Sequence, residues 1–215
     1  MGTPSEHWLL NGPAGPMEVL VDFPATIAGI ALVAHPHPLF GGANTNKVAY
    51  TLAYALADLG YVALRPNFRG VGKSGGAHDH GVGETDDLLW LLAEARTRFD
   101  PDGRLPVALA GFSFGAYVQT RVAKRLAEAG TPAKRMVFVG IAAGHVEGTR
   151  TYEPEAIAPD SLLIHGDLDT TVPLANALHF ATPLQIPVVV IPGADHFFHG
   201  KLNLLRDIIK RAWRD

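Results

Sequence analysis

A serine, two aspartates and a histidine occur in an order and setting suited to nucleophilic catalysis. Ser113 lies in the sequence Gly-Phe-Ser-Phe-Gly, directly after a run of small and branched apolar residues. Asp167 and Asp169 follow a second apolar run, and His196 follows a third. A serine hydroxyl becomes a nucleophile when a histidine removes its proton and a carboxylate holds that histidine in the right tautomer. If the fold brings them together, these residues predict acyl transfer through a covalent serine intermediate.

The pattern along the chain predicts the elements that position these residues. Short apolar runs alternate with amphipathic segments from residue 27 to the end, which is typical of a parallel sheet with helices on both faces. An antiparallel hairpin is expected before them, at 6–23. The predicted fold class is α/β, a mostly parallel doubly wound sheet in a single domain over residues 1–215. We expect buried strands at 27–34, 61–65, 105–110, 136–141, 161–165 and 188–191, and helices at 46–59, 84–99, 114–129, 173–181 and 202–213.

The residues around Ser113 predict a sharp turn between a strand and a helix. Such a turn puts the serine in an unfavourable backbone conformation and needs neighbours without side chains, which Gly111 and Gly115 supply. The N–H of Phe114 would begin the helix and point to the same place as the hydroxyl, where it can stabilise an oxyanion. The alternative is a packed Gly-Ser-Gly turn, which leaves the polar groups at the other strand ends unexplained.

Five segments together resemble the α/β-hydrolase superfamily. Within it, the chain is similar to small lidless bacterial serine hydrolases that carry the motif H-P-H-P-x-x-G-G after the third strand. The resemblance implies the α/β-hydrolase fold and hydrolysis of an ester, thioester or amide through an acyl-serine, with no cofactor. The matching segments are 35–42, 66–74, 111–115, 165–173 and 193–198.

The resemblance places the general base after the last strand, at His196. The alternative is His199, three residues further on, which we expect to begin the final helix. Between them, Phe197 and Phe198 are expected to pack into the core beneath His196.

Two aspartates compete for the role of the acid that orients this histidine. A carboxylate directly after a glycine often closes a turn, and this is the position of Asp167. The resemblance instead matches Asp169 to the acid, and Asp167 stays as the alternative. Asp195, beside the histidine, is interpreted as a surface turn residue.

The second oxyanion donor is expected in the loop 35–42. Both histidines of this loop precede a proline, which holds them extended, and the prolines themselves have no N–H. We expect the donor to be the N–H of Leu39 or that of Phe40, with two glycines after them that allow a close approach of the backbone.

Four histidines and one arginine invite other interpretations. His35 and His37 are conceivable metal ligands together with His78 and His80, but no further carboxylate or histidine spacing supports a metal site, and none is predicted. A histidine bonded to backbone groups is the commoner fate. Arg69 belongs to a glycine-rich loop at 67–76, and by the resemblance it braces that loop beside the active site.

The spacing after the strand at 136–141 limits the size of any lid. About twenty residues separate this strand from the next, which is too few for a cap of several helices. We therefore expect an open, lidless site for small or extended acyl groups. Phe112 and Phe114 flank the serine on opposite sides of the turn, so at most one of them faces the substrate. The residues expected to line the acyl pocket are the segment 144–157 with Phe40, Phe112, Phe114 and Tyr117.

Composition excludes several other classes of protein. The chain has no cysteine, which removes disulfides, thiolate catalysis and cysteine metal sites. A net charge of −3 without a run of Lys or Arg argues against nucleic-acid binding. No apolar run is long enough to span a bilayer, and the first residues lack the basic start and apolar core of a signal peptide. We expect a cytoplasmic monomer or homodimer whose partner is a small-molecule ester or thioester.

Two alternatives to an esterase or thioesterase remain. The same three residues can act on a peptide, amide or lactone, because a fold does not determine a substrate. The chain can also be a non-catalytic ligand-binding protein built on the hydrolase fold.

Overall fold

The computed structural model describes residues 4–148 and 150–213, so the single domain expected over 1–215 includes six residues outside the described part. The strands are β1 (Ser5–Gly12), β2 (Gly15–Asp22), β3 (Gly29–Ala34), β4 (Tyr61–Pro66), β5 (Val107–Phe112), β6 (Arg135–Val139), β7 (Gly144–His145), β8 (Thr151–Tyr152), β9 (Leu162–Gly166) and β10 (Val188–Ile191). The helices are α1 (Lys47–Asp58), α2 (Val82–Phe99), α3 (Phe114–Glu128), α4 (Leu174–Ala181) and α5 (Leu202–Ala212), with short 3-10 helices η1 (Pro38–Phe40) and η2 (Thr182–Leu184).

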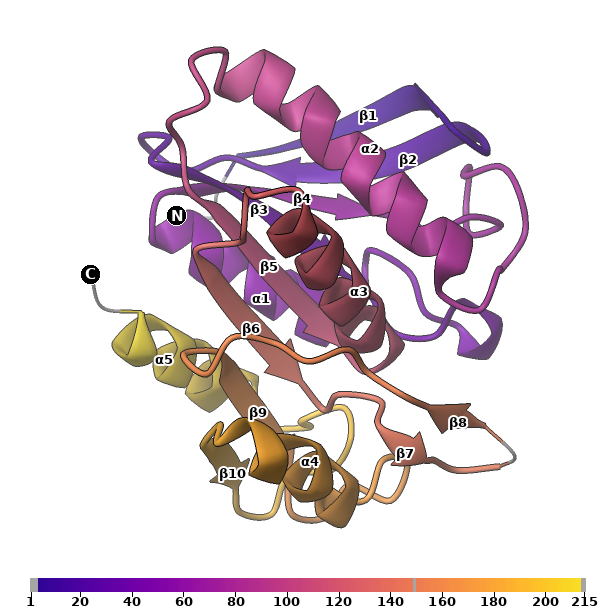
Figure 1. Ribbon diagram of the computed structural model, residues 1–215, viewed down its shortest axis with the longest axis vertical. Helices are drawn as coiled ribbons and strands as arrows, with labels where there is room; N and C mark the ends of the chain where they lie inside the picture. Colours follow the sequence, from indigo (N-terminus) through magenta and orange to yellow (C-terminus); the bar gives the residue numbers. More distant parts are fainter. Residues whose placement is uncertain (1–3, 149, 214–215) are drawn as a thin grey trace.

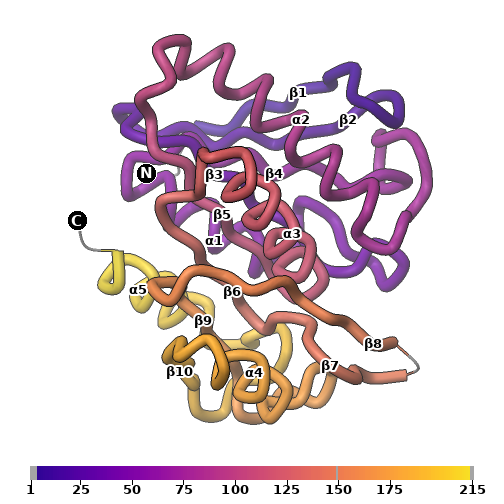
Figure 2. Tube along the Cα trace, viewed as in Figure 1, coloured from indigo at the N-terminus to yellow at the C-terminus, as the bar shows by residue number. Residues whose placement is uncertain are grey.

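Eight of the strands form one sheet in the order β1-β2-β4-β3-β5-β6-β9-β10 (Figure 1). The strand β2 pairs antiparallel with β1 and with β4, and the remaining pairs of this sheet are parallel. Figure 2 follows the chain from the hairpin at one edge of the sheet to β10 at the other. The predicted fold class, a mostly parallel α/β sheet with an N-terminal antiparallel hairpin, is confirmed.

Helices cover both faces of the sheet because its central strands are apolar on both. In β3, Ile30 and Leu32 face the core shared with α2 and α3, whereas Ala31 and Val33 face the core shared with α1 and α5. This alternation follows from the period of two along a strand. A strand that is buried on both faces must read as a continuous apolar run, as β3 does. None of the helices within 4–148 and 150–213 has the length and apolar character needed to cross a membrane.

The boundaries of the predicted elements differ from the observed ones at the ends that matter for the site. The strand β5 continues two residues beyond the predicted end at 110, because Gly111 and Phe112 still pair with β6. Its last residue is therefore adjacent to Ser113. The tiny strands β7 and β8 were not predicted, since two residues are too few to show a period.

The segment between β6 and β9 forms the β7–β8 hairpin, which projects at the right-hand side of Figure 1. Within its described residues this segment contains no helix. The C-terminal ends of the parallel strands are therefore bordered by short loops and this hairpin.

Candidate active site

The turn between β5 and α3 holds Ser113 in a strained conformation. Its φ is 56° and its ψ −119°, in a region that costs a residue with a side chain about 1–3 kcal/mol. Two backbone bonds hold it there: the Ser113 N–H donates to the Val139 carbonyl at 2.9 Å, and its own carbonyl accepts the Ala142 N–H at 3.2 Å. The strain is thus maintained by the neighbouring strand β6 and by the loop that follows it.

The two glycines of this turn are required by close backbone approaches. A Cβ on Gly111 would lie 2.6 Å from the Ala116 nitrogen, and one on Gly115 would lie 2.4 Å from the Ala34 carbonyl oxygen. Real Cβ atoms essentially never come this near to backbone, so any side chain would push α3 away from β5 and β3. The glycines therefore allow the first turn of α3 to sit directly against the sheet.

The structure brings Ser113, His196 and Asp169 together at the C-terminal edge of the sheet. The Ser113 Oγ lies 3.1 Å from His196 Nε2, and His196 Nδ1 lies 2.7 Å from Asp169 Oδ2. All three residues are buried, with 5–7% of each exposed. With the carboxylate accepting from Nδ1–H, Nε2 is left as the acceptor that can take a proton from the hydroxyl.

The Asp169 carboxylate is held by backbone as well as by histidines. Its Oδ1 accepts the N–H groups of Thr171 at 2.9 Å and Val172 at 2.8 Å. Its Oδ2, which faces His196, also lies 3.4 Å from Nε2 of the buried His165. That His165 nitrogen lies 2.8 Å from the Val172 carbonyl, so the ring packs between the acid and its own loop. Each oxygen of Asp169 therefore has separate partners.

Asp167 holds two loops together and lies away from this group. Its Oδ1 accepts the Gly193 N–H at 2.6 Å, next to a bond from the Leu168 N–H to the Ala194 carbonyl at 3.0 Å. These contacts tie the loop after β9 to the loop after β10. The turn-closing role that the sequence indicated for Asp167 matches this position.

His199 is exposed and does not begin the final helix, which corrects that expectation, since α5 starts at Leu202. Its Nδ1 lies 2.6 Å from Asp195 Oδ2, and this hydrogen bond lowers the pKa of Asp195. The expected burial of the aromatic pair is half correct. Phe198 is fully buried, but Phe197 is 45% exposed because the turn directs consecutive side chains to opposite sides.

The candidate oxyanion donors lie in different states. Phe114 is the first residue of α3, so its N–H has no acceptor within the helix, and none is found among the described residues. The Leu39 N–H donates to His37 Nδ1 at 3.2 Å, and the Phe40 N–H donates to the His37 carbonyl at 3.1 Å. Either of the latter must share or release its present acceptor to reach an oxyanion.

Known proteins share both this sequence and this architecture. A family model described as Thioesterase domain matches residues 63–206. An alpha-beta serine hydrolase homologue from Coxiella burnetii is 38% identical, with a TM-score of 0.83 over 97% of each chain. A Xanthomonas campestris protein described as an a/b serine hydrolase without lid is 35% identical, with a TM-score of 0.83 over 99% of this chain and 94% of that one. An uncharacterized Rickettsia prowazekii protein is 36% identical over 206 residues, which cover 89% of this chain and 81% of the relative.

The chain belongs to the thioesterase-domain family of α/β hydrolases. Its resemblance to lidless serine hydrolases is thereby confirmed at the level of the superfamily, and the protein is a hydrolase.

In this hydrolase, His35 connects the loop 35–42 to the glycine-rich loop. Its Nε2 accepts the Phe68 N–H at 2.9 Å, so its Nδ1–H donates to the Pro36 carbonyl at 2.7 Å. Both ring nitrogens are thereby used, and burial lowers the pKa of His35 to about 4. The rings of His37, His78 and His80 lie in a row, with 4.8 Å between neighbouring centroids. No group of three His, Asp or Glu in the described part of the chain is arranged to hold a metal ion.

The neutral His35 predicts a loss of stability in acid. Because its folded pKa is depressed, the unfolded chain binds the proton first, so stability is present above pH 6.5 and is lost as the pH falls toward 4. We expect about 2 kcal/mol less stability at pH 5 than at pH 7 from this residue. Urea unfolding of wild type and His35→Gln at both pH values measures it. An equally steep pH dependence in the variant would contradict the assignment.

Arg69 braces the glycine-rich loop of the hydrolase against α2. Its Nε and Nη2 each donate to Asp87 at 2.8 Å, and this pairing raises the pKa of Arg69. A Cβ on Gly83 would lie 1.9 Å from the guanidinium, so the first turn of α2 needs a glycine there. The structural role expected for Arg69 agrees with these contacts.

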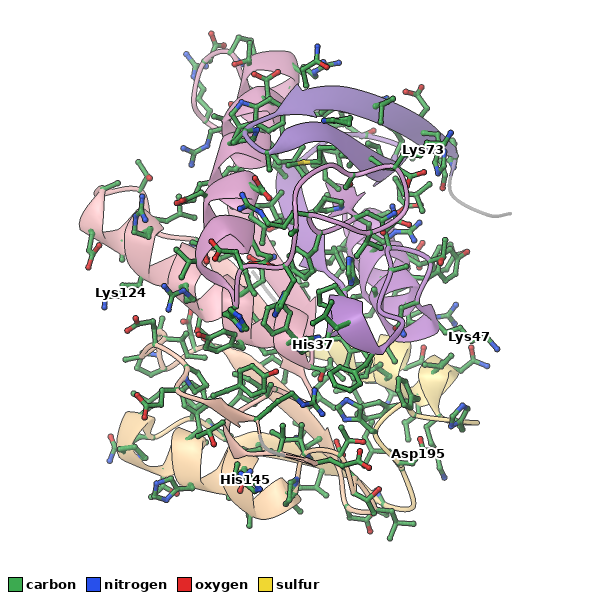
Figure 3. All side chains as sticks on the ribbon, turned by 90° about the vertical axis from the view of Figure 1, so that its right-hand side faces the viewer. His37, Lys47, Lys73, Lys124, His145 and Asp195 are labelled. Carbon is green, nitrogen blue, oxygen red and sulfur yellow. The ribbon has the colours of Figure 1, made fainter. Side chains whose placement is uncertain are left out.

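Two neighbouring cavities open near Ser113. The smaller, of about 180 Å³, contains Ser113 and His196 in its lining together with Phe40, and Leu39 is not part of that lining. The larger, of about 540 Å³, is lined by Phe114 and Tyr117 among others. Figure 3 shows this side of the molecule, with His37, which lines both cavities, near its centre.

Phe112 lines neither cavity, which corrects that part of the expected acyl pocket. Its ring packs 4.8 Å from that of His196 and 5.9 Å from that of Phe197, on the opposite side of the turn from Phe114. Phe112 therefore supports the histidine from below, and only Phe114 of the two faces a cavity.

Proposed function

We propose that this protein is a serine hydrolase that cleaves an ester or thioester of a small or extended acyl group through an acyl-serine. The observation that carries the proposal is the position of His196, within hydrogen-bond distance of Ser113 Oγ at 3.1 Å and of Asp169 Oδ2 at 2.7 Å. A nucleophile, a base and an orienting acid in this geometry are the parts that acyl transfer needs. The thioesterase-domain match supports the same class of reaction.

In the first half of the proposed reaction, Ser113 Oγ attacks the carbonyl carbon of the substrate as His196 Nε2 takes the hydroxyl proton. The Phe114 N–H and one from Leu39 or Phe40 bind the oxyanion. Stabilising charge where it develops in the transition state is usually the largest single contribution to such catalysis. His196 then returns the proton to the leaving alkoxide or thiolate, which departs as the alcohol or thiol.

In the second half, water attacks the acyl-serine and His196 takes the proton from that water. Collapse of the second tetrahedral intermediate releases the carboxylic acid and returns the proton to Ser113. Asp169 keeps the proton of His196 on Nδ1 throughout and stabilises the imidazolium that forms twice in the cycle. No cofactor takes part in this scheme.

The short loops around Ser113 support a site that works without a lid, in a single domain. Between β6 and β9 the described residues form only loops and the β7–β8 hairpin, and Leu39 and Phe40 are 69% and 67% exposed at the mouth of the site. Large exposed apolar side chains at a cavity mouth are typical of a binding surface. A substrate longer than the 180 Å³ cavity can therefore extend along the surface.

Labelling with a fluorophosphonate probe tests the proposal. We expect stoichiometric modification of wild type, read as a mass increase of the intact protein, and none in Ser113→Ala, because only an activated serine attacks the phosphorus. The matched control is Ser161→Ala, whose hydroxyl donates to the Ala158 carbonyl and has no histidine partner. It should label like wild type.

Folding of each variant is checked by circular dichroism. A well-folded wild type that is not modified would overturn the proposal in favour of a non-catalytic binding protein. Undiminished labelling of Ser113→Ala would move the nucleophile to another residue.

A further inference from the structure

The larger cavity beside Ser113 can take one arm of a bound substrate. It shares His37, Phe40 and Arg150 with the smaller cavity that contains Ser113, so the two meet along these residues. An ester whose carbonyl reaches Ser113 therefore has one substituent directed toward this space. The cavity is lined by His37, Leu39, Phe40, His78, His80, Phe114, Tyr117, Arg150, Thr151 and Tyr152.

Aromatic rings form most of the walls of this larger cavity. The centroids of Phe114, Tyr117 and Tyr152 lie 5.1–6.0 Å from one another. The His37 ring lies 4.8 Å from Phe114 and 4.9 Å from Phe40, which continues the wall toward Ser113. Rings at these separations offer flat faces and edges that suit a further planar ring.

Arg150 is the only Lys, Arg, Asp or Glu in the lining of this cavity. Its guanidinium carbon lies 4.1 Å from the centroid of Phe40, and its Nη2 donates to the Glu147 carbonyl at 2.9 Å. Among residues 4–148 and 150–213, no carboxylate lies within 4.0 Å of its nitrogens, whereas Arg65 and Arg69 are both paired with an aspartate. A guanidinium has five N–H donors, so Arg150 retains the capacity to bind an anion.

The neighbouring groups add to this positive character. Burial, followed by the charges of His78, Arg150 and His80, lowers the pKa of His37 to about 4. His37 is therefore neutral, and because Nδ1 accepts the Leu39 N–H, its proton is on Nε2. The nearest carboxylate of the site, Glu147, lines only the smaller cavity, where it accepts from the Thr171 hydroxyl at 3.4 Å.

We infer that the larger cavity binds a planar aromatic arm of the substrate that carries a carboxylate, with the ring between the aromatic walls and the carboxylate on Arg150. This inference rests on the proposed hydrolase activity and adds the class of substrate. Two observations support its two halves: the aromatic lining selects the ring, and the unpaired guanidinium selects the anion. A carboxylate is the planar anion that an arginine binds through two parallel hydrogen bonds.

Two matched pairs of esters test the inference on either side of the scissile bond. Methyl benzoate is compared with methyl hydrogen terephthalate, which places the ring on the acyl side. Phenyl acetate is compared with 4-acetoxybenzoate, which places it on the leaving group. In one pair, we expect kcat/KM of wild type to be about 10-fold or more higher for the carboxylated ester, and Arg150→Gln to remove that preference, as for a charge-assisted hydrogen bond.

Two controls separate charge from shape. Arg104→Gln changes the same charge at an exposed residue before β5, at the far edge of the sheet, and should keep the preference. The monomethyl ester of cyclohexane-1,4-dicarboxylic acid keeps the anion but loses the flat ring, and we expect it to be cleaved several-fold less efficiently than methyl hydrogen terephthalate.

The inference is overturned if the neutral ester is preferred in both pairs, or if Arg150→Gln leaves the ratio unchanged. Equal cleavage of the cyclohexane and benzene acids would remove the aromatic half. If Ser113 reacts with the fluorophosphonate probe but none of these esters is cleaved, the inference fails and the serine hydrolase stands. If Ser113 does not react at all, the proposed function fails with it.

Discussion

Replacing Asp169 with asparagine should lower kcat on an activated ester by about 10⁴-fold, the loss typical of a wrong histidine tautomer. The reason lies in the separate partners of the two carboxylate oxygens. Asp169 Oδ1 accepts two backbone N–H groups, at 2.9 and 2.8 Å, and only an oxygen satisfies these donors. The asparagine oxygen will therefore take that position and turn the amide nitrogen toward His196.

That orientation inverts the hydrogen bond to the histidine. An NH₂ group donates to Nδ1, so the proton of the neutral ring moves to Nε2, which then faces the Ser113 hydroxyl as a donor. Such a histidine cannot take the hydroxyl proton. Hydrolysis of 4-nitrophenyl acetate at pH 7.5, with circular dichroism to verify folding, measures the effect, and we expect the fold to be retained because the side chain keeps its shape.

Asp167→Asn is the matched control, two residues away in the same loop. Its carboxylate accepts one bond, from the Gly193 N–H, and an asparagine oxygen can accept the same bond. We expect kcat within a few-fold of wild type. A loss as large as that of Asp169→Asn, or less than 10-fold loss in Asp169→Asn itself, would mean that the orienting acid is assigned to the wrong residue.

The sequence predicted the gathering of Ser113, Asp169 and His196 because parallel strands end at the same edge of a sheet. These residues follow β5, β9 and β10, and each of those strands was visible as a short apolar run. The choice between two aspartates was beyond spacing, since both follow β9. Only the fold shows that Asp167 turns back to Gly193 while Asp169 reaches His196.

The walls of the site were much harder to predict. Arg150 belongs to the β7–β8 hairpin, whose strands have two residues each and no detectable period. Its place in the lining depends on how that hairpin packs against the loop 35–42, about a hundred residues earlier in the chain. The roles of Phe112 and Phe197 likewise depend on which way a turn directs neighbouring side chains.

A buried ion pair between Asp22 and Arg65 escaped the sequence for the same reason, because its members come from β2 and β4. Nε of Arg65 lies 2.8 Å from Oδ2 of Asp22 and Nη2 lies 3.1 Å from Oδ1, with 2–3% of each residue exposed. Nη1 donates to the Asn44 carbonyl at 2.6 Å. Arg65 therefore links the antiparallel part of the sheet to the chain just after the loop 35–42.

Removing either charge alone should lower the free energy of unfolding by about 3–5 kcal/mol, because the remaining ion stays buried without a partner. We expect this loss for Asp22→Leu and for Arg65→Met in urea unfolding. The double variant should be more stable than either single one, since two apolar side chains leave no unpaired charge. Additive losses in the double variant, or a single loss below about 1 kcal/mol, would show that the pair is not what these residues contribute.

Activity distinguishes the ion pair from the anchor on Asn44. The double variant recovers the burial but not the bond from Arg65 Nη1 to the Asn44 carbonyl, so the end of the loop 35–42 stays unanchored on that side. The same loop carries Leu39 and Phe40, the proposed second oxyanion donors, and losing one such donor costs about 10²–10³-fold in kcat. We therefore expect the double variant to regain stability while its kcat stays below that of wild type. Full recovery of both would mean that the loop holds its position without Arg65, through the bond from the Asn44 N–H to the Asn67 side chain alone.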